Sequence, residues 1–224
     1  MAVITPPAGV LRPRDATFFP RWTTRTAGRR LSDGQEQIVS PGYCIWQIDY
    51  AIPATFDGEM VRKFEVFIRE LRGRANIAAL TVCDPYRYGA KVSPMQEPWS
   101  DGTWFTDGTG FVSAAGGVHP LAVTIPVAAG ATTLRTDFAN PTRPRLRPGD
   151  YFSAEGRLYA VQNSSQDGWV RFEPPARQAI PAGAVLQTDA PVIHARLADD
   201  DQGRRARELL RWGAPVTLSF VEAD

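Results

Sequence analysis

Glycine and proline interrupt this chain at short intervals, with 19 of each among 224 residues. Proline cannot continue the interior of a helix, and glycine favours tight turns. Long helical bundles do not tolerate that density, whereas short strands joined by turns do. The spacing therefore predicts a mainly β fold of the α+β type.

Composition narrows the function classes. Hydrophobic residues make up 43% of the chain and charged residues 22%, as in ordinary globular proteins. Lys plus Arg number 25 and Asp plus Glu 24, so the net charge of +1 gives no reason to expect nucleic-acid binding. Nearly all of the basic residues are arginine, which is enriched at protein interfaces. This bias favours a chain that binds other proteins.

Neither the first nine residues nor the apolar runs of the chain indicate a signal peptide or a membrane span. Residues 1–9 lack the charged and apolar regions of a signal peptide, and no apolar stretch approaches the ~18 residues of a membrane span. Cys44 and Cys83 each lie in a strand-like apolar run. A disulfide is possible in principle, but two buried reduced thiols are expected in a cytosolically assembled protein.

The first twenty residues are expected to be irregular, because four prolines interrupt them. One interpretation is a frayed terminus. The other is an arm that lies on a neighbouring subunit, with Phe18, Phe19 and Trp22 as anchors. The sequence leaves both open.

The two ends of the chain predict one α+β layer. In residues 57–72, apolar side chains recur at helical spacing, Asp57 is a suitable N-cap and Gly73 a suitable stop. A shorter helix is expected over 204–212. Alternating apolar residues predict strands over 43–52, 77–83, 193–197 and 216–221.

The middle of the chain predicts a separate all-β domain. Short strands are expected over 121–127, 132–136, 151–154, 157–162, 169–172 and 185–187, with turn residues between them. This spacing is typical of a small closed or nearly closed β-barrel. The expected organisation is a discontinuous domain of residues 1–90 and 191–224, interrupted by an inserted barrel at 91–190.

Motifs for catalysis or metal binding are missing from the sequence. His119 and His194 have no partner at metal-ligand spacing, and no nucleophile elbow or phosphate loop occurs. The acids at 199–201 suit a helix N-terminus better than a metal site. We therefore expect no enzyme activity, cofactor or metal, although calcium at the Asp-Gly-Thr turns of Asp101 and Asp107 stays an alternative.

One segment offers an alternative of another class. Glu97, Asp101 and Asp107 lie close in sequence to the aromatic residues Trp99, Trp104 and Phe105. Aromatic rings beside acids can stack on sugars, so this loop suggests a carbohydrate-binding module or, less well, a glycoside hydrolase. The other interpretation is a structural loop whose aromatic side chains pack on the barrel or on a neighbour.

Several short phrases follow one another in order along the chain. The first is FIRELRG at 67–73, followed by Ala75-Asn76 and a strand to Cys83-Asp84-Pro85. The others are LRPGDYF at 146–152, GRLYAV at 156–161, EPPAR at 173–177, IPAG at 180–183 and the closing 216–223, which ends in FVEA. Together these phrases resemble distal tail proteins of siphovirus-like phages, and the minor tail-tip proteins of such phages are the alternative family. The resemblance covers most of the chain from about Phe18 onward.

The resemblance implies a structural virion protein of the phage tail tip, assembled in the host cytoplasm. It implies a hexameric ring of identical subunits that connects the tail tube protein to the tip hub protein. It also implies a ring-forming β-sheet domain with one long helix and an inserted OB- or galectin-like barrel. The contact residues expected for such a ring are the aromatic anchors Phe18, Phe19 and Trp22 and the arginines Arg25, Arg29, Arg30, Arg143 and Arg145. A solvated face is the alternative for the arginines.

Overall fold

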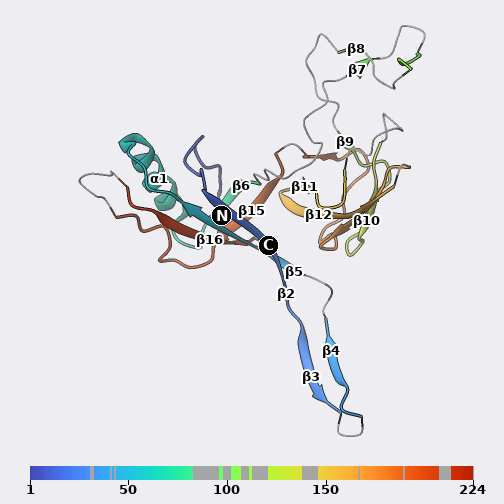
Figure 1. Cartoon of the computed structure of the whole chain (residues 1–224), viewed down its shortest axis with the longest axis horizontal. Helices are drawn as coiled ribbons and strands as arrows, with labels where there is room; N and C mark the ends of the chain where they lie inside the picture. Colours follow the sequence, from blue (N-terminus) through green and yellow to red (C-terminus); the bar gives the residue numbers. More distant parts are fainter. Residues whose placement is uncertain are drawn as a thin grey trace. The chain divides into compact units, whose positions relative to one another are not determined.

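A computed structural model describes the chain as two compact units (Figure 1). The described residues are 1–30, 33–40, 42, 44–82, 96–97, 102–106, 111–112, 121–137, 146–165, 167–188, 190–206 and 213–223. The first unit comprises Met1–Thr81 and Ile193–Asp224, and the second comprises Val82–Val192. The boundaries therefore lie at 81/82 and 192/193, where the sequence suggested 90/91 and 190/191.

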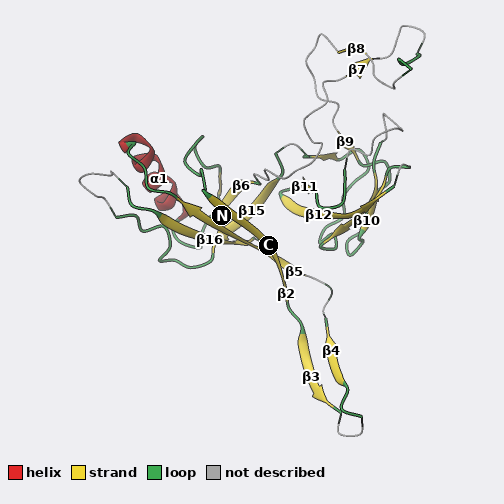
Figure 2. Ribbon diagram, viewed as in Figure 1, coloured by secondary structure: helices red, strands yellow, loops and turns green. Residues whose placement is uncertain are grey.

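A six-stranded sheet forms the first unit, with the strand order β1-β6-β15-β16-β5-β2. Its strands are β1 (Val3–Ile4), β2 (Asp15–Trp22), β5 (Cys44–Ile52), β6 (Ile77–Thr81), β15 (Val192–Leu197) and β16 (Val216–Glu222). The β1–β6 pair is parallel, and the pairs β15–β16, β16–β5 and β2–β5 are antiparallel. The structure is mainly β, and a single helix is labelled in Figure 2 among the parts that it describes.

The sheet has one buried face and one open face. Along β5 the buried residues alternate strictly with half-buried ones, as the period-2 pattern predicts. The buried set continues on β16 with Leu218 and Phe220, which lie directly across from Tyr50 and Ile48. The half-buried set includes Ile45, Gln47 and Asp49 on the opposite face.

Helix α1 (Gly58–Leu71) contributes the apolar side chains Val61, Phe64, Phe67 and Leu71 to this core. The Asp57 carboxylate caps the helix by accepting hydrogen bonds from the backbone N–H groups of Glu59 and Met60. A hydrogen bond to Glu59 raises the pKa of Lys63 on the exposed side. The predicted helix is thus confirmed, although Arg72 with φ 50° adopts the left-handed cap conformation before Gly73 does.

The expectation that residues 1–20 are irregular is wrong for residues 3–4 and 15–20, which form strands, and holds for residues 5–14 between them. Val3–Ile4 pair with β6, and Asp15–Trp22 pair with β5 at eight successive positions. Pro20 is compatible with this because β2 lies at the edge of the sheet, where one row of backbone N–H groups needs no partner. Pro20 therefore lies in a paired edge strand, whereas Pro6, Pro7 and Pro13 lie in the segment between β1 and β2.

The prediction of a helix starting at Arg204 is also wrong, because residues 204–206 are irregular. Residues 207–212 lie outside the described residues. The Arg205 guanidinium donates to the backbone carbonyls of Ala214 at 2.8 Å and Pro53 at 2.7 Å, and it lies over the Phe64 ring. Burial lowers the pKa of Arg205. This side chain joins three segments of the first unit.

The strands of the second unit form a closed circuit of pairings. A four-stranded sheet has the order β10-β13-β12-β11, and β14 pairs with β9. Isolated bridges Ser153↔Gln187 and Val123↔Thr136 join the two sheets at both sides. The strands are β9 (Leu121–Ala122), β10 (Thr133–Arg135), β11 (Tyr151–Ala154), β12 (Arg157–Ser164), β13 (Trp169–Glu173) and β14 (Val185–Leu186). Two further short strands, β7 (Gln96–Glu97) and β8 (Phe111–Val112), pair with each other.

Aromatic side chains fill the interior of this circuit. The Phe152 ring stacks on Tyr159 at 5.3 Å between centroids, and Phe172 contacts both rings edge-to-face. Aliphatic side chains from every strand of the circuit surround them. The turn at Glu155-Gly156 has positive φ at both residues, as a tight hairpin requires. The interior is therefore a packed core, as in other small barrels.

Candidate subunit interface

A long hairpin, here called the arm, extends β2 and β5 beyond the sheet. It spans residues 25–39 and consists of β3 (Arg25–Arg29), β4 (Glu36–Val39) and the turn between them (Figure 1). Hydrogen bonds from Arg30 N–H to the Gln35 carbonyl and from Gly34 N–H to the Arg30 carbonyl close the turn. Every described residue of the arm is exposed.

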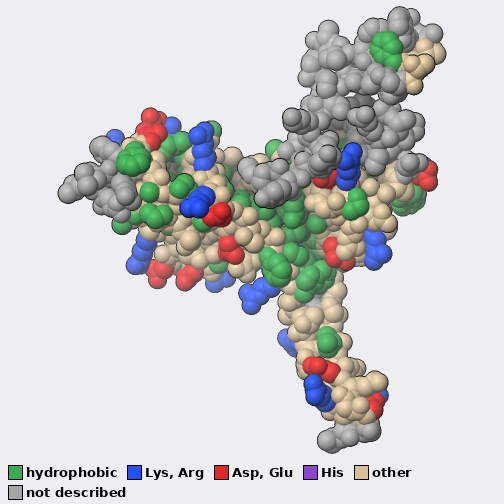
Figure 3. All heavy atoms as spheres, in the orientation of Figure 1, with side chains coloured by type: hydrophobic (Ala, Val, Ile, Leu, Met, Phe, Trp, Pro, Cys, Tyr) green, Lys and Arg blue, Asp and Glu red, His purple; other side chains and the backbone are tan. Residues whose placement is uncertain are grey.

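The arm has no core of its own. Ile38 is 62% exposed and Val39 51%, although both are large apolar side chains. On the face drawn in Figure 3 the arm carries basic and acidic side chains in addition. A two-stranded hairpin without a packed face is marginally stable in water. The arm would therefore be stabilised by packing against another protein surface.

The arm emerges from the edge strand β2, which is itself mostly exposed on both faces. The Phe18 ring faces the core, where it contacts Tyr50 edge-to-face at 6.0 Å. The side chain of Phe19 is 59% exposed and that of Trp22 39%. Of the three predicted anchors, Phe19 and Trp22 thus remain accessible, and Phe18 contributes to the fold of the first unit.

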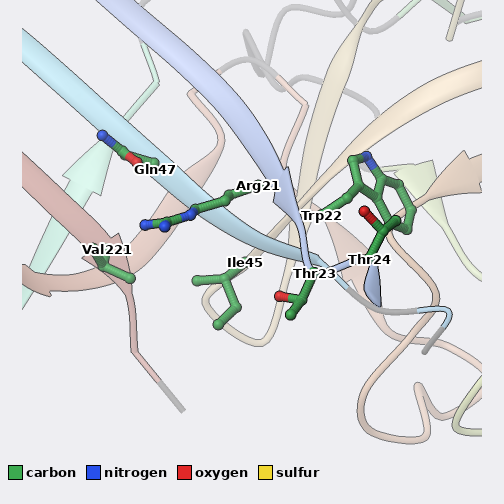
Figure 4. Close-up of a pocket in the computed structure, with 7 residues that line it drawn as sticks. All are labelled: Arg21, Trp22, Thr23, Thr24, Ile45, Gln47 and Val221. Atoms are coloured by element: carbon green, nitrogen blue, oxygen red, sulfur yellow. The ribbon is translucent and has the colours of Figure 1, made fainter. Parts of the chain in front are cut away.

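A hollow of about 340 Å³ lies where the arm begins, within the first unit. Its lining residues are Arg21, Trp22, Thr23, Thr24, Ile45, Gln47 and Val221. Arg21 lies across from Ile45, and Gln47 lies across from Val221, so these four side chains share the open face of the sheet. Figure 4 shows Arg21 between Gln47 and Ile45, whereas Trp22 points the other way.

The predicted arginine sites fall into two groups. Arg25 and Arg29 lie on β3 and Arg30 begins the turn, all exposed, so this cluster belongs to the arm. Arg143 and Arg145 lie outside the described residues. No hairpin over residues 25–39 was predicted from the sequence, although Arg25, Arg29 and Arg30 were expected to be contact residues. The turn residues Asp33-Gly34 between two polar-apolar runs are the signal that indicates a hairpin.

The predicted glycan-contact loop is described only in part. Trp104 is 40% exposed and Phe105 37%. Trp99, Asp101 and Asp107 lie outside the described residues, as do His119 and Cys83, and nothing is described of the Glu97 side chain. Cys44 is buried on β5.

Within the described ranges, no three His, Cys, Asp or Glu side chains come close enough together to hold a metal ion. Of the helical residues that the structure places, none form a segment long and apolar enough to cross a membrane. A scan against protein-family models finds no match, and a search of curated proteins finds no significant relative. The function is therefore inferred from the arm, the edge strand β2 and the hollow.

Proposed function

We propose that this chain is a structural subunit of a siphovirus-like phage tail tip, a distal tail protein in class. Six copies form a ring that connects the tail tube protein to the tip hub protein in the virion. The ordered phrases from FIRELRG at 67–73 to FVEA at 220–223 support the class. The closed circuit of strands in the second unit is compatible with the OB- or galectin-like barrel that the class implies. The subunit binds proteins and carries out no reaction.

The main support for this proposal is the exposure of the arm, an antiparallel hairpin in which every described residue is exposed. Natural proteins usually shorten, charge or cover such edges, because unpaired strands attract other chains. An identical neighbour can cover the arm and β2 at once. Contacts of this head-to-tail kind generate a closed ring when the rotation between subunits is suitable.

Removal of the arm tests this proposal. Replacing residues 25–39 by a short Gly-Ser turn is expected to convert a wild-type hexamer into monomers, because the neighbour loses its contact surface. Mass photometry and light scattering measure the change. The fold should survive, since the described arm residues, 25–30 and 33–39, are all exposed, and circular dichroism checks this. An arm-less variant that still forms hexamers would remove the arm from the ring contact.

A second candidate function is glycan binding by the tail tip, favoured by the adjacent exposed side chains of Trp104 and Phe105. Aromatic faces stack on sugar rings, so Trp104→Ala is expected to weaken binding to host-surface glycans at least tenfold. Isothermal titration calorimetry measures it, with Trp169→Ala as the control, because Trp169 is a comparably exposed tryptophan. If wild-type protein shows no saturable binding, this candidate is excluded.

A further inference from the structure

We infer that the hollow at the base of the arm receives strand β4 of a second copy, with Glu36 beside Arg21 and Ile38 over Ile45 and Val221. This inference rests on the proposed ring and names both partners of its contact. Each copy carries both this arm and this hollow, so the contact is heterologous and can be repeated around a ring.

The charges of the two surfaces are complementary. Arg21 forms no ion pair with an acidic side chain anywhere in the described ranges. Glu36 is exposed and likewise has no ion pair there, although Arg29 lies across from it in the ladder. Such charges contribute little while they stay in water, but at an interface they determine which partner and which register is accepted.

The apolar parts fit the same register. Glu36 and Ile38 are two residues apart on β4, so both side chains point to one face of the strand, about 7 Å apart. On the receiving sheet Arg21 and Ile45 are directly opposed on neighbouring strands, and Gln47 with Val221 forms the adjacent pair. In the proposed contact, one acidic and one apolar side chain of β4 therefore meet one basic and two apolar side chains of the receiving sheet.

The position of Ile38 supports the same occupant. It is the more exposed of the two apolar side chains of β4, at 62%. Seated over Ile45 and Val221, it covers a floor that is only half-buried in the single chain. Burial of apolar area drives association, and the rim charges then fix the orientation.

Cysteine cross-linking between two differently tagged chains tests the contact directly. One chain carries Ile38→Cys, the other Val221→Cys, both with Cys83→Ser. Mild oxidation is expected to join the two tags in most of the mixed rings. Gln37→Cys is the matched control, because residue 37 points to the opposite face of β4, and its cross-link to Val221→Cys should be at least tenfold weaker.

Charge reversal gives a second readout. Arg21→Glu and Glu36→Arg should each weaken self-association at least tenfold, since like charges meet in every contact. An equimolar mixture of the two variants should assemble again, because alternating subunits restore an opposite pair at each contact. Arg62→Glu and Glu70→Arg on exposed positions of α1 serve as controls and should leave assembly unchanged.

The outcomes separate the two proposals. Wild-type rings with neither the cross-link nor the rescue by mixing would overturn this inference and leave the ring in place. A wild-type chain that stays monomeric at high concentration would overturn both. Rings with a cross-link specific for residue 38 over residue 37 support the arm of a second copy as the occupant, even if Glu36→Arg also disturbs the arm next to Arg29.

Discussion

Replacing Phe172 by alanine is expected to lower the free energy of unfolding of the second unit by about 3–5 kcal/mol. The side chain is fully buried on β13, and its ring contacts Phe152 at 5.6 Å and Tyr159 at 5.1 Å between centroids. Truncation removes the apolar surface and leaves a cavity among aromatic rings that cannot collapse without losing their own contacts. Amide hydrogen exchange on β12 and β13 measures the loss locally.

Arg171→Ala provides the control for Phe172. Residue 171 is the neighbour on the same strand, but its side chain is exposed on the outer face. A change within about 0.5 kcal/mol is expected there. Equal losses at positions 171 and 172 would contradict the alternation of buried and exposed residues on which the closed circuit depends.

The second large effect is expected at Phe220, in the sheet of the first unit. Phe220→Ala should lower the free energy of opening of β5 and β16 by about 3–5 kcal/mol. The side chain is fully buried on a strand with neighbours on both sides, directly across from Ile48 and edge-to-face with Tyr50 at 6.1 Å. Hydrogen exchange of the amides of both strands gives the local value.

Ser219→Ala is the corresponding control, since residue 219 lies on the open face across from Asp49. Its effect on the same amides should be small. If Phe220→Ala left the protection of β5 unchanged, the buried face of the sheet would have been assigned to the wrong side chains.

Segments with a strong local pattern could be predicted from the sequence. The helix at Gly58–Leu71 has an apolar stripe and an N-cap, and both act within a few residues. The hairpin from Tyr151 to Ser164 has its Glu155-Gly156 turn, and the alternation along Cys44–Ile52 gives the buried face of β5. In each case the information lies in side chains close together in the chain.

The segments whose conformation was predicted wrongly are held by residues far away in the sequence. Strand β2 contains a proline and mostly exposed side chains, so nothing local indicates that it pairs with β5 across the base of the arm. In the same way, the irregular conformation at 204–206 is held by Arg205 bonding to carbonyls at positions 53 and 214. The hollow is lined by residues of β2, β5 and β16. The register between these strands cannot be predicted from any one of them alone.

The arm illustrates why the candidate interface was predicted only in part. The arginines at 25–30 indicated a contact surface through their chemistry, and the structure places them on the hairpin. Ile38 and Val39 were not among the predicted contact residues. Their exposure follows from the three-dimensional structure, in which no described residue packs over this part of the arm.

The central claim is that identical copies complete one another into a ring. Electron microscopy of the purified wild-type chain at high concentration, with light scattering on the same sample, tests it most directly. We predict closed rings with six-fold symmetry and a mass six times the 24.6 kDa of one chain. Single particles with the mass of one chain and no ring at any concentration would contradict it.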